Sequence, residues 1–350
     1  MSIFIHADLL RNFVTWAPSC EDNRGNIDLR AYWRGLVVAE KQKFTVRAMP
    51  VGAEIVGLEE GAEQDPAVRK GVYDAWLEHG VLLFENVDPT SELHIALSRV
   101  FGSLKEIQAQ VVARTEEDTP PTVIDIRHDP EDAGIVEIDG KQISHWLPWH
   151  YDHCYNDTLW HAAVLRPVVI PSDGGLTGFV DGIQMYNALP PALRARIDGL
   201  NILYTLDVLY ENMRFGKPAT FREIRIPPTA YGPTSMAKDL PRGVHPAVWT
   251  RATGEKVLHI SPWMAVGIEH HEDAHGDALL EDVCQAMLAH ATPYYHHWQP
   301  TELMAWDNWR MLHSVTGTRP VNRRRMQRTT ILGDYGLGYF EKPREAVRAS

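Results

Sequence analysis

Short apolar segments of strand length recur along most of the chain, and this pattern constrains the fold more than any other feature. They are bounded by Gly, Pro and Asp residues that are typical of turns. Segments of this kind lie at residues 80–84, 122–126, 160–170, 257–260, 301–306 and 328–332. Helical patterns are fewer, and they lie at residues 65–77, 91–100, 181–189, 191–197 and 277–290. Many short strands with few helices predict a mostly β protein with a jelly-roll core and flanking helices.

The chain shows no internal repeat and no linker that would divide it into separate domains. Residues 44–340 are therefore predicted to form a single domain, with an N-terminal extension at 1–43 and a tail at 341–350. Residues 205–245 are rich in Pro and Tyr and lack periodicity. We predict that they form a lid, because long irregular segments are usually functional. The acidic, Gly-containing stretch 128–144 is expected to be a mobile loop.

The composition limits the partners that the chain can have. Its 350 residues carry a formal net charge of −12, whereas nucleic acids and anionic membranes require a cationic surface. Three Cys residues lie far apart, which favours a reducing compartment over a disulfide scaffold or a structural zinc site. The sequence shows no signal peptide, and no window approaches the ~20 apolar residues of a membrane span. A cytoplasmic protein with a small-molecule partner is therefore expected.

One short stretch, residues 149–153, carries the most specific chemistry. His150 and Asp152 are two residues apart, and on an extended strand such residues point to the same face. An imidazole and a carboxylate aimed at one point suit a divalent transition metal. Non-haem Fe(II) oxygenases add a second His to such a pair and leave the opposite side open. The pair alone also occurs by chance in a chain with 17 His and 46 acidic residues, so a second His is needed.

His313 is the candidate for that second ligand, and it follows a Trp-Asp-Asn motif near the C-terminus. A dense cationic run at residues 319–328 comes soon after it, in a chain that is otherwise acidic. The run is either a solvated basic loop or part of an anion pocket near the metal, since Arg binds carboxylates bidentately. If this run continues as a strand, Arg324 and Arg328 share one face.

Residues 271–275 match His-Glu-x-x-His, the signature of zinc peptidases. That chemistry requires a helix with both His residues on one face and apolar residues behind them. The flanking residues are polar, Gly276 is expected to break the helix, and Asp277 is expected to cap the next one. The stretch is therefore predicted to be an exposed polar loop, and a zinc peptidase is the less favoured function.

Together and in order, the metal and anion motifs resemble the TauD/TfdA family, the taurine and aryloxyacetate dioxygenases that use Fe(II) and 2-oxoglutarate. The resemblance covers residues 44–340 and rests on four pieces. They are Trp-His-x-Asp at 149–152, Gly-Gly-x-Thr at 174–177, Trp306-Asp307-Asn308 with His313, and Arg324 with Arg328 before Gly333-Asp334. The resemblance implies a double-stranded β-helix, which is the cupin-like form of the jelly roll.

The resemblance also implies a role for each motif residue. The implied Fe(II) ligands are His150, Asp152 and His313. Thr177 and Arg324 would hold the distal carboxylate of 2-oxoglutarate, and Arg328 would lie beside the metal, near the cosubstrate and the anionic group of the substrate. Halogenases of this kind replace the carboxylate at position 152 with a small residue, so Asp152 favours oxygenation. The expected reaction consumes O2 and 2-oxoglutarate and releases succinate and CO2.

The residues that bind the substrate in taurine enzymes are not matched. The sulfonate-binding His would align with Ile107 and a substrate-facing Asn with Trp146, so taurine is not expected. The candidate substrate residues are Trp146, His153, Tyr155, Tyr210 and Arg328. They favour a small organic acid with an aromatic group, which is hydroxylated or is cleaved after hydroxylation. The alternative is a non-catalytic jelly-roll protein that binds a metal or an anion. A homo-oligomer is common in the resembling family.

Overall fold

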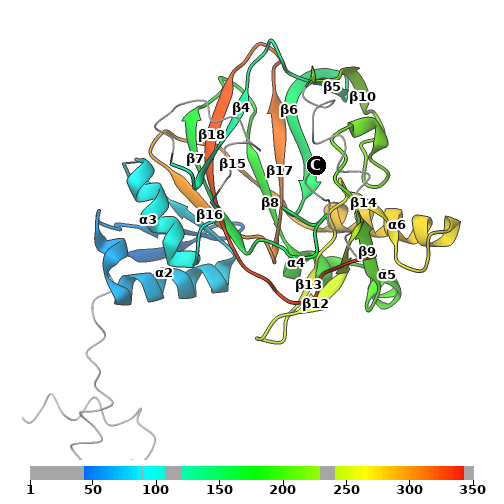
Figure 1. The fold of residues 1–350 in the computed structure, drawn as a ribbon, viewed down its shortest axis with the longest axis horizontal. Helices are drawn as coiled ribbons and strands as arrows, with labels where there is room; N and C mark the ends of the chain where they lie inside the picture. Colours follow the sequence, from blue (N-terminus) through cyan, green and yellow to red (C-terminus); the bar gives the residue numbers. More distant parts are fainter. Residues whose placement is uncertain (1–42, 89, 107–119, 229–240, 343–350) are drawn as a thin grey trace, which may run out of the picture. The chain divides into compact units, whose positions relative to one another are not determined.

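The computed structural model describes residues 43–88, 90–106, 120–228 and 241–342. The predicted N-terminal extension and C-terminal tail lie almost entirely outside the described residues, as does Ile107. Strands predominate in the part of the chain that the structure describes, which confirms the prediction of a mostly β fold (Figure 1). No helix in the described ranges is long and apolar enough to cross a membrane.

Two mainly antiparallel sheets form the core (Figure 1). The first has the strand order β1 (Thr45–Ala48), β2 (Ala53–Val56), β3 (Val81–Phe84), β16 (Leu303–Asp307), β7 (Ala162–Val169), β18 (Arg324–Ile331) and β4 (Val123–His128). The second has the order β10 (Arg222–Arg225), β5 (Ile135–Ile138), β6 (Lys141–His150), β17 (Met311–Thr318), β8 (Thr177–Asp181) and β15 (Tyr294–His296). Met304 and Trp306 of the first sheet pack with Phe179 of the second in one buried cluster. This packing of two sheets is the predicted jelly roll.

The remaining elements cover this core. A third sheet has the order β14 (Ala265–Ile268), β9 (Asn201–Tyr204), β11 (Gly243–Pro246) and β19 (Tyr339–Phe340), and β12 (Val248–Thr250) pairs with β13 (Lys256–Leu258). The helices are η3 (Ala62–Gln64), α2 (Pro66–His79), α3 (Ser91–Phe101), α4 (Gly182–Ala188), α5 (Pro191–Ile197), η4 (Tyr210–Asn212) and α6 (Ala274–His290). Helices α2 and α3 pack with the first sheet, whereas α4, α5 and α6 pack with the third.

Helices α2 and α3 each begin after a side chain that caps their first turn. Asp65 accepts a hydrogen bond from the backbone N–H of Ala67 at 2.9 Å, and Pro66 occupies the first helical position. Thr90 caps α3 in the same manner, because its hydroxyl accepts from a backbone N–H at 3.1 Å. Helix α2 ends at Gly80, whose φ of 75° is the left-handed conformation of a helix stop.

Residues 128–144 do not form the mobile loop that their acidic composition predicted. They contain β5 and the first residues of β6, which are joined by a two-residue turn at Asp139-Gly140. Both turn residues have positive φ values, 52° and 72°, as required by a hairpin turn whose twist matches the strands. The acidic composition of the stretch pointed to a loop, but the stretch contains an Asp-Gly turn between two strands. This hairpin matters for function because β6 carries His150.

Helix α6 begins before the predicted cap at Asp277, and two expectations about this region are therefore wrong. Asp273 is the capping residue, since its Oδ1 accepts from the backbone N–H groups of His275 and Gly276, each at 2.9 Å. Gly276 lies inside the first turn and does not break the helix. A Cβ atom there would collide with the carbonyl oxygen of His271, so only glycine fits. His271 and His275 are exposed, as predicted, but Ala274 and His275 belong to α6 and not to a loop. Neither histidine belongs to a metal-ligand group among the described residues.

The segment 205–245 contains η4, β10 and the start of β11, so its described part is less irregular than predicted. Residues 229–240 of this segment lie outside the described residues. A lid function for 205–245 stays a prediction.

Candidate metal centre and its surroundings

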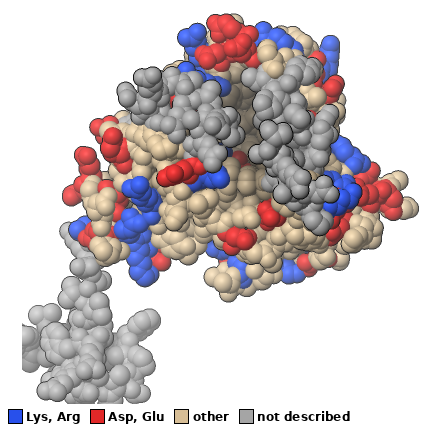
Figure 2. Space-filling model, in the orientation of Figure 1, with Lys and Arg blue, Asp and Glu red and all other residues tan. Residues whose placement is uncertain are grey.

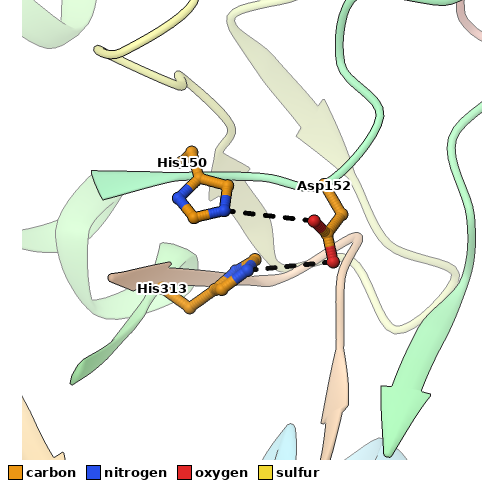
Figure 3. A group of neighbouring side chains, drawn as sticks. All are labelled: His150, Asp152 and His313. Atoms are coloured by element: carbon orange, nitrogen blue, oxygen red, sulfur yellow. Dashed lines mark ion pairs between the residues drawn. The ribbon is translucent and has the colours of Figure 1, made fainter. Parts of the chain in front are cut away.

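His150, Asp152 and His313 come together in the structure (Figure 3). His150 ends β6 and pairs with His313 of β17 across the second sheet. The Nε2 atom of His150 lies 3.9 Å from Oδ1 of Asp152, and the Nε2 atom of His313 lies 3.8 Å from Oδ2. Within the described ranges, these residues form the one group of three His, Cys, Asp or Glu side chains whose ligand atoms all lie within 4.8 Å of one another.

Asp152 reaches this point from a turn, and not from the strand that the His-x-Asp spacing predicted. Strand β6 ends at His150, and the amide of Asn308 holds the residues that follow. Asn308 Oδ1 accepts from the backbone N–H of Asp152 at 2.8 Å, and Asn308 Nδ2 donates to the Asp152 carbonyl at 2.9 Å. Asn308 belongs to the Trp-Asp-Asn motif. That motif therefore fixes the backbone of Asp152 in addition to preceding His313.

The three side chains are in the protonation states that metal binding requires. His150 Nδ1 donates to the Pro148 carbonyl at 2.7 Å, because a carbonyl only accepts, so Nε2 keeps its lone pair. Burial lowers the pKa of His150, and it lowers the pKa of His313 to about 3. Burial alone would raise the pKa of Asp152, but the charge of Arg328 keeps that pKa below its usual range. Two neutral imidazoles and a carboxylate fit a divalent transition metal with open positions.

Arg328 of β18 touches the carboxylate of this centre. Its Nη1 donates to Oδ2 of Asp152 at 2.7 Å, and its guanidinium carbon lies 6.0 Å from the centroid of the Trp160 ring. The Nε atom of Arg328 is buried and has no hydrogen-bond partner in the described part of the chain. A cation with an unused donor beside the centre is suited to an anionic ligand.

Arg324 lies on the same strand and is 2% exposed. Its Nε donates to the Gly175 carbonyl at 3.2 Å and its Nη1 donates to His145 Nε2 at 3.1 Å, whereas its buried Nη2 has no partner among the described residues. Its neighbours Arg323 and Arg325 form ion pairs with acidic side chains, but no ion pair within the described ranges involves Arg324. Burial lowers the pKa of Arg324 to about 10, so the guanidinium stays charged at neutral pH. A buried cation without an anion is unfavourable, and an anionic ligand would offset that cost.

Thr177 of β8 is 2% exposed, and it has one hydrogen left to donate. The indole N–H of Trp298 donates to Thr177 Oγ1 at 3.0 Å. Because an indole nitrogen only donates, the hydroxyl proton of Thr177 is available for an acceptor. Two residues earlier, Gly175 has a φ of 65°, and a Cβ there would lie 3.2 Å from Cδ of Arg324. The Gly-Gly-x-Thr motif thus allows the backbone to lie against the Arg324 side chain.

An aromatic row runs from the predicted lid segment to the metal centre. The Trp146 ring lies 5.3 Å from the Tyr210 ring and 5.7 Å from the Phe221 ring, measured between centroids. Tyr210 lies 5.8 Å from Trp263, which meets the His150 ring edge-on at 5.2 Å. Two of the predicted substrate residues, Trp146 and Tyr210, therefore pack together and connect through Trp263 to a ligand of the centre.

The other predicted substrate residues lie on the Arg328 side. The His153 ring stacks on Trp160 with centroids 3.9 Å apart, and Tyr155 lies 5.4 Å from His153. Trp160 in turn contacts the Arg328 guanidinium. Sequence reasoning missed Trp160, and it missed Trp263 and Phe221 as well. No motif or spacing marks an aromatic residue that reaches a site only through another ring.

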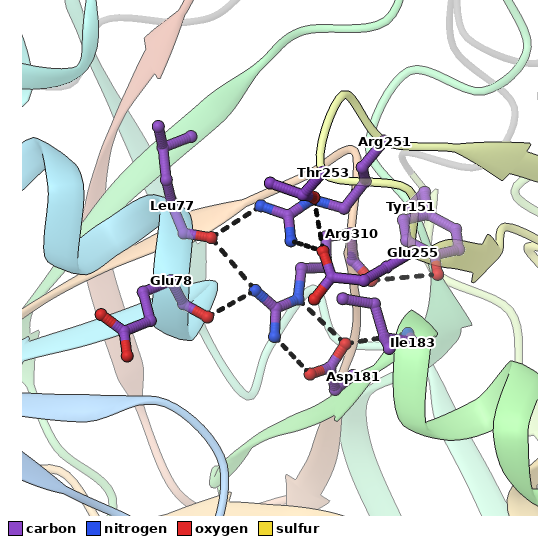
Figure 4. A network of polar contacts seen from close by, with 9 residues as sticks. All are labelled: Leu77, Glu78, Tyr151, Asp181, Ile183, Arg251, Thr253, Glu255 and Arg310. Atoms are coloured by element: carbon purple, nitrogen blue, oxygen red, sulfur yellow. Dashed lines mark hydrogen bonds and ion pairs between the residues drawn. The ribbon is translucent and has the colours of Figure 1, made fainter.

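A separate polar network fixes the strand that carries His313 (Figure 4). Arg310, just before β17, donates to both carboxylate oxygens of Asp181 at 3.0 and 2.6 Å. Its Nη1 donates to the carbonyl oxygens of Leu77 and Glu78, which satisfies the C-terminal turn of α2. The Tyr151 hydroxyl, between the two ligands His150 and Asp152, donates to the Leu258 carbonyl at 2.9 Å. These contacts hold the two ligand-bearing segments to the surrounding frame.

Comparison with known proteins agrees with this geometry. The profile of the family described as "Taurine catabolism dioxygenase TauD, TfdA family" matches residues 42–330. The chain is 29% identical over 284 residues to an (S)-phenoxypropionate/alpha-ketoglutarate-dioxygenase of Sphingobium herbicidovorans, which covers 81% of this chain and 92% of that protein. It is 25% identical over 296 residues to a pentalenolactone F synthase of Streptomyces arenae, which covers 83% of this chain and 94% of that protein.

A solved structure of a putative alpha-ketoglutarate-dependent taurine dioxygenase from Burkholderia xenovorans superimposes with a TM-score of 0.63. The superposition covers 85% of this chain and 95% of the solved chain at 23% sequence identity, so it supports the fold. The chain belongs to the TauD/TfdA family of dioxygenases. It is an oxidoreductase that depends on Fe(II) and uses 2-oxoglutarate and O2 as cosubstrates. The family favours this function over a non-catalytic binding protein or a zinc peptidase.

Proposed function

We propose that the chain hydroxylates a small carboxylic acid with an aromatic group, and that its iron ligands are His150, Asp152 and His313. One observation carries this proposal. Two guanidinium groups on β18, the buried one of Arg324 and the half-buried one of Arg328, each keep a buried nitrogen without a partner in the described part of the chain. One contacts the carboxylate of the centre, and the other lies four residues away on the same strand. Two such cations suit two anionic ligands, a cosubstrate and a substrate.

Each residue then has a definite task. Arg324 and Thr177 bind the distal carboxylate of 2-oxoglutarate, through the free guanidinium hydrogens and the free hydroxyl proton. Arg328 binds the anionic group of the substrate, or the near end of the cosubstrate, through its unpaired Nε hydrogen. Bound iron supplies the oxidation, in which 2-oxoglutarate, O2 and the substrate C–H give succinate, CO2 and the hydroxylated product. The surrounding aromatic rings exclude water and orient the substrate.

The aromatic preference rests on the rings of Trp146, Tyr210, His153 and Tyr155, which connect to the centre through Trp263 and Trp160. A relative named for (S)-phenoxypropionate supports an aryloxyalkanoate, which combines an aromatic ring with a carboxylate. Another relative, at 25% identity, is named pentalenolactone F synthase, so similarity alone does not identify the substrate and the substrate has to be measured.

Substrate-dependent formation of succinate tests the proposal. The purified chain, with Fe(II), ascorbate and 2-oxoglutarate, is given matched compounds in parallel. A phenoxypropionate is compared with its amide, which removes the anion, and with its cyclohexyl analogue, which removes the aromatic ring. We expect turnover of the acid, little with the amide and reduced turnover with the cyclohexyl compound. A preference for alkyl sulfonates or sulfate esters over all aryloxy acids would contradict the proposed substrate class.

The iron ligands are tested separately, because the uncoupled consumption of 2-oxoglutarate needs no correct substrate. We expect His150→Ala and Asp152→Ala to abolish succinate formation and to weaken Fe(II) binding in the same preparation. Retained turnover in either variant would contradict the assignment. Residues 44–340 as one domain, 205–245 as its lid, a homo-oligomer and a cytoplasmic location remain part of the proposal. Size-exclusion chromatography with light scattering tests the oligomer.

A further inference from the structure

The function proposed above leaves one contact of Arg324 unexplained, its hydrogen bond to His145. Nη1 of the arginine donates to Nε2 of the histidine at 3.1 Å. A guanidinium only donates, so this imidazole nitrogen must be an unprotonated acceptor, and the ring carries its hydrogen on Nδ1. Burial, Arg324 and the neighbouring His128 all lower the pKa of His145 well below its usual value, which is consistent with a neutral ring.

His145 is held in place by its own strand and by a second histidine. Its φ of 52° lies in the left-handed region, which His adopts more readily than most residues. The His128 ring meets the His145 ring edge-on, with centroids 5.1 Å apart. His128 is the cross-strand partner of Arg324 in the first sheet, and its Nε2 bonds to the Ser144 hydroxyl at 2.8 Å. Both sheets therefore contribute to the position of the Arg324 side chain.

Counting hydrogens shows what this contact leaves free. A guanidinium carries five N–H groups in one plane. In Arg324 one is given to the Gly175 carbonyl and one to His145. The remaining three are one on Nη1 and two on Nη2, whose nitrogen has no partner in the described ranges. Adjacent hydrogens on Nη1 and Nη2 form the fork that grips a carboxylate bidentately.

We propose that His145 is a positioning residue for the 2-oxoglutarate site: it accepts one hydrogen of Arg324 and thereby turns the Nη1–Nη2 fork toward the distal carboxylate. This inference rests on the proposed role of Arg324. In this proposal His145 acts only through Arg324. Without the acceptor, the guanidinium can rotate toward other oxygen atoms, and part of the binding energy of the cosubstrate is lost in restoring its orientation.

The test measures binding of 2-oxoglutarate to the full chain loaded with Fe(II) under anaerobic conditions, by isothermal titration calorimetry. His145→Leu removes the acceptor, and His145→Gln retains an amide oxygen at similar size on the same backbone. We expect the dissociation constant to rise about tenfold in the first variant and less than threefold in the second. In steady-state turnover, the KM for 2-oxoglutarate should rise in His145→Leu while the KM for the organic substrate stays constant.

A double-mutant cycle separates the positioning role of His145 from the proposed role of Arg324. In an Arg324→Met background, His145→Leu should cause no further loss, because its effect passes through the arginine. Unchanged affinity in His145→Leu, or equal losses with Leu and Gln, would overturn the positioning role. Wild-type chain that does not bind 2-oxoglutarate, or unchanged affinity in Arg324→Met, would instead overturn the proposed site. Should His145→Leu fail to fold, the pair His145→Gln and His145→Ala asks the same question.

Discussion

Two buried arginines in this barrel have opposite surroundings. Arg310 and Arg324 are 6% and 2% exposed. Arg310 directs all three of its nitrogen atoms at oxygen acceptors, including both oxygens of Asp181. Burial opposes its charge, but the Asp181 carboxylate more than compensates and raises the pKa of Arg310. Arg324 meets only a carbonyl and a neutral imidazole among the described residues, and burial lowers its pKa to about 10.

The difference separates a structural cation from one prepared for a ligand. Burial alone does not distinguish them, because both side chains lie inside the protein. The criterion is whether the protein itself completes the partners of the guanidinium. Asp181 and the end of α2 complete those of Arg310, so its role is to join elements. Arg324 lacks an anionic partner within the described ranges, so its role requires a molecule from outside.

Replacing Arg310 should give the largest change in stability. Arg310→Met removes both guanidinium donors of the Asp181 carboxylate, which keeps only the backbone N–H of Ile183 among the described residues, and it removes the donor to the Glu78 carbonyl. Removing one member of a buried ion pair costs about 3–5 kcal/mol. Urea denaturation followed by tryptophan fluorescence measures this loss, and Arg251→Met serves as a control because Arg251 donates to the same Leu77 carbonyl from a more exposed ion pair. A loss below 1 kcal/mol would remove the distinction between the two arginines.

Arg324→Met should show the reverse pattern. Folding is expected to change by less than about 1 kcal/mol, since the substitution removes a buried charge without an anionic partner and leaves no carboxylate behind. The affinity for 2-oxoglutarate should fall about 100-fold, because a buried charge-assisted bidentate contact is lost. Calorimetry and the same urea titration check both halves. A strongly destabilised variant with normal affinity for 2-oxoglutarate would mean that Arg324 is a structural residue like Arg310.

Asp307 tests the electrostatics near Arg310 through the pH dependence of stability. Burial raises the pKa of Asp307 to about 6, although Arg310 lowers it. The folded pKa thus exceeds the unfolded value of about 3.9, so the folded chain binds the extra proton and loses stability as pH rises from about 4 to 6. Asp307→Asn does not titrate. Relative to this variant, the wild type should lose roughly 1–3 kcal/mol across that range in urea titrations. A loss of stability on lowering the pH would mean that the charge of Arg310 outweighs burial and lowers the pKa of Asp307.

Trp298→Phe should give the smallest effect. The variant keeps most of the packing but loses the indole N–H that donates to Thr177. The hydroxyl of Thr177 can then rotate, and we expect the dissociation constant of 2-oxoglutarate to rise about threefold to fivefold. Thr177→Val provides the upper limit, because it removes the hydroxyl itself. If Trp298→Phe matches wild type while Thr177→Val weakens binding, the indole contributes packing alone.

Much of the site was already visible in the sequence, because its residues lie in short motifs at fixed distances along the chain. The pairing of His150 with Asp152, the shared strand of Arg324 and Arg328, and the mostly β fold were predicted from spacing and composition, and the family resemblance added His313 to the cluster. Such features depend on local geometry or on a family pattern. The errors arose where composition was a poor guide. The acidic stretch 128–144 contains a hairpin. Gly276 lies inside a helix, at a position where the carbonyl oxygen of His271 leaves no room for a Cβ.

Only the tertiary structure decided which arginine has an anionic partner within the protein and which one has none among the described residues. In the sequence, Arg324 belongs to the cationic run and Arg310 comes two residues after the Trp-Asp-Asn motif, but their partners lie far away along the chain. Arg310 meets Asp181 and α2, and Arg324 meets Gly175 and His145, through the register of strands in two different sheets. A hydrogen bond between residues 179 positions apart has no periodicity to reveal it. The motifs therefore determined which groups are available, and the packing of the sheets determined which of their donors remain free.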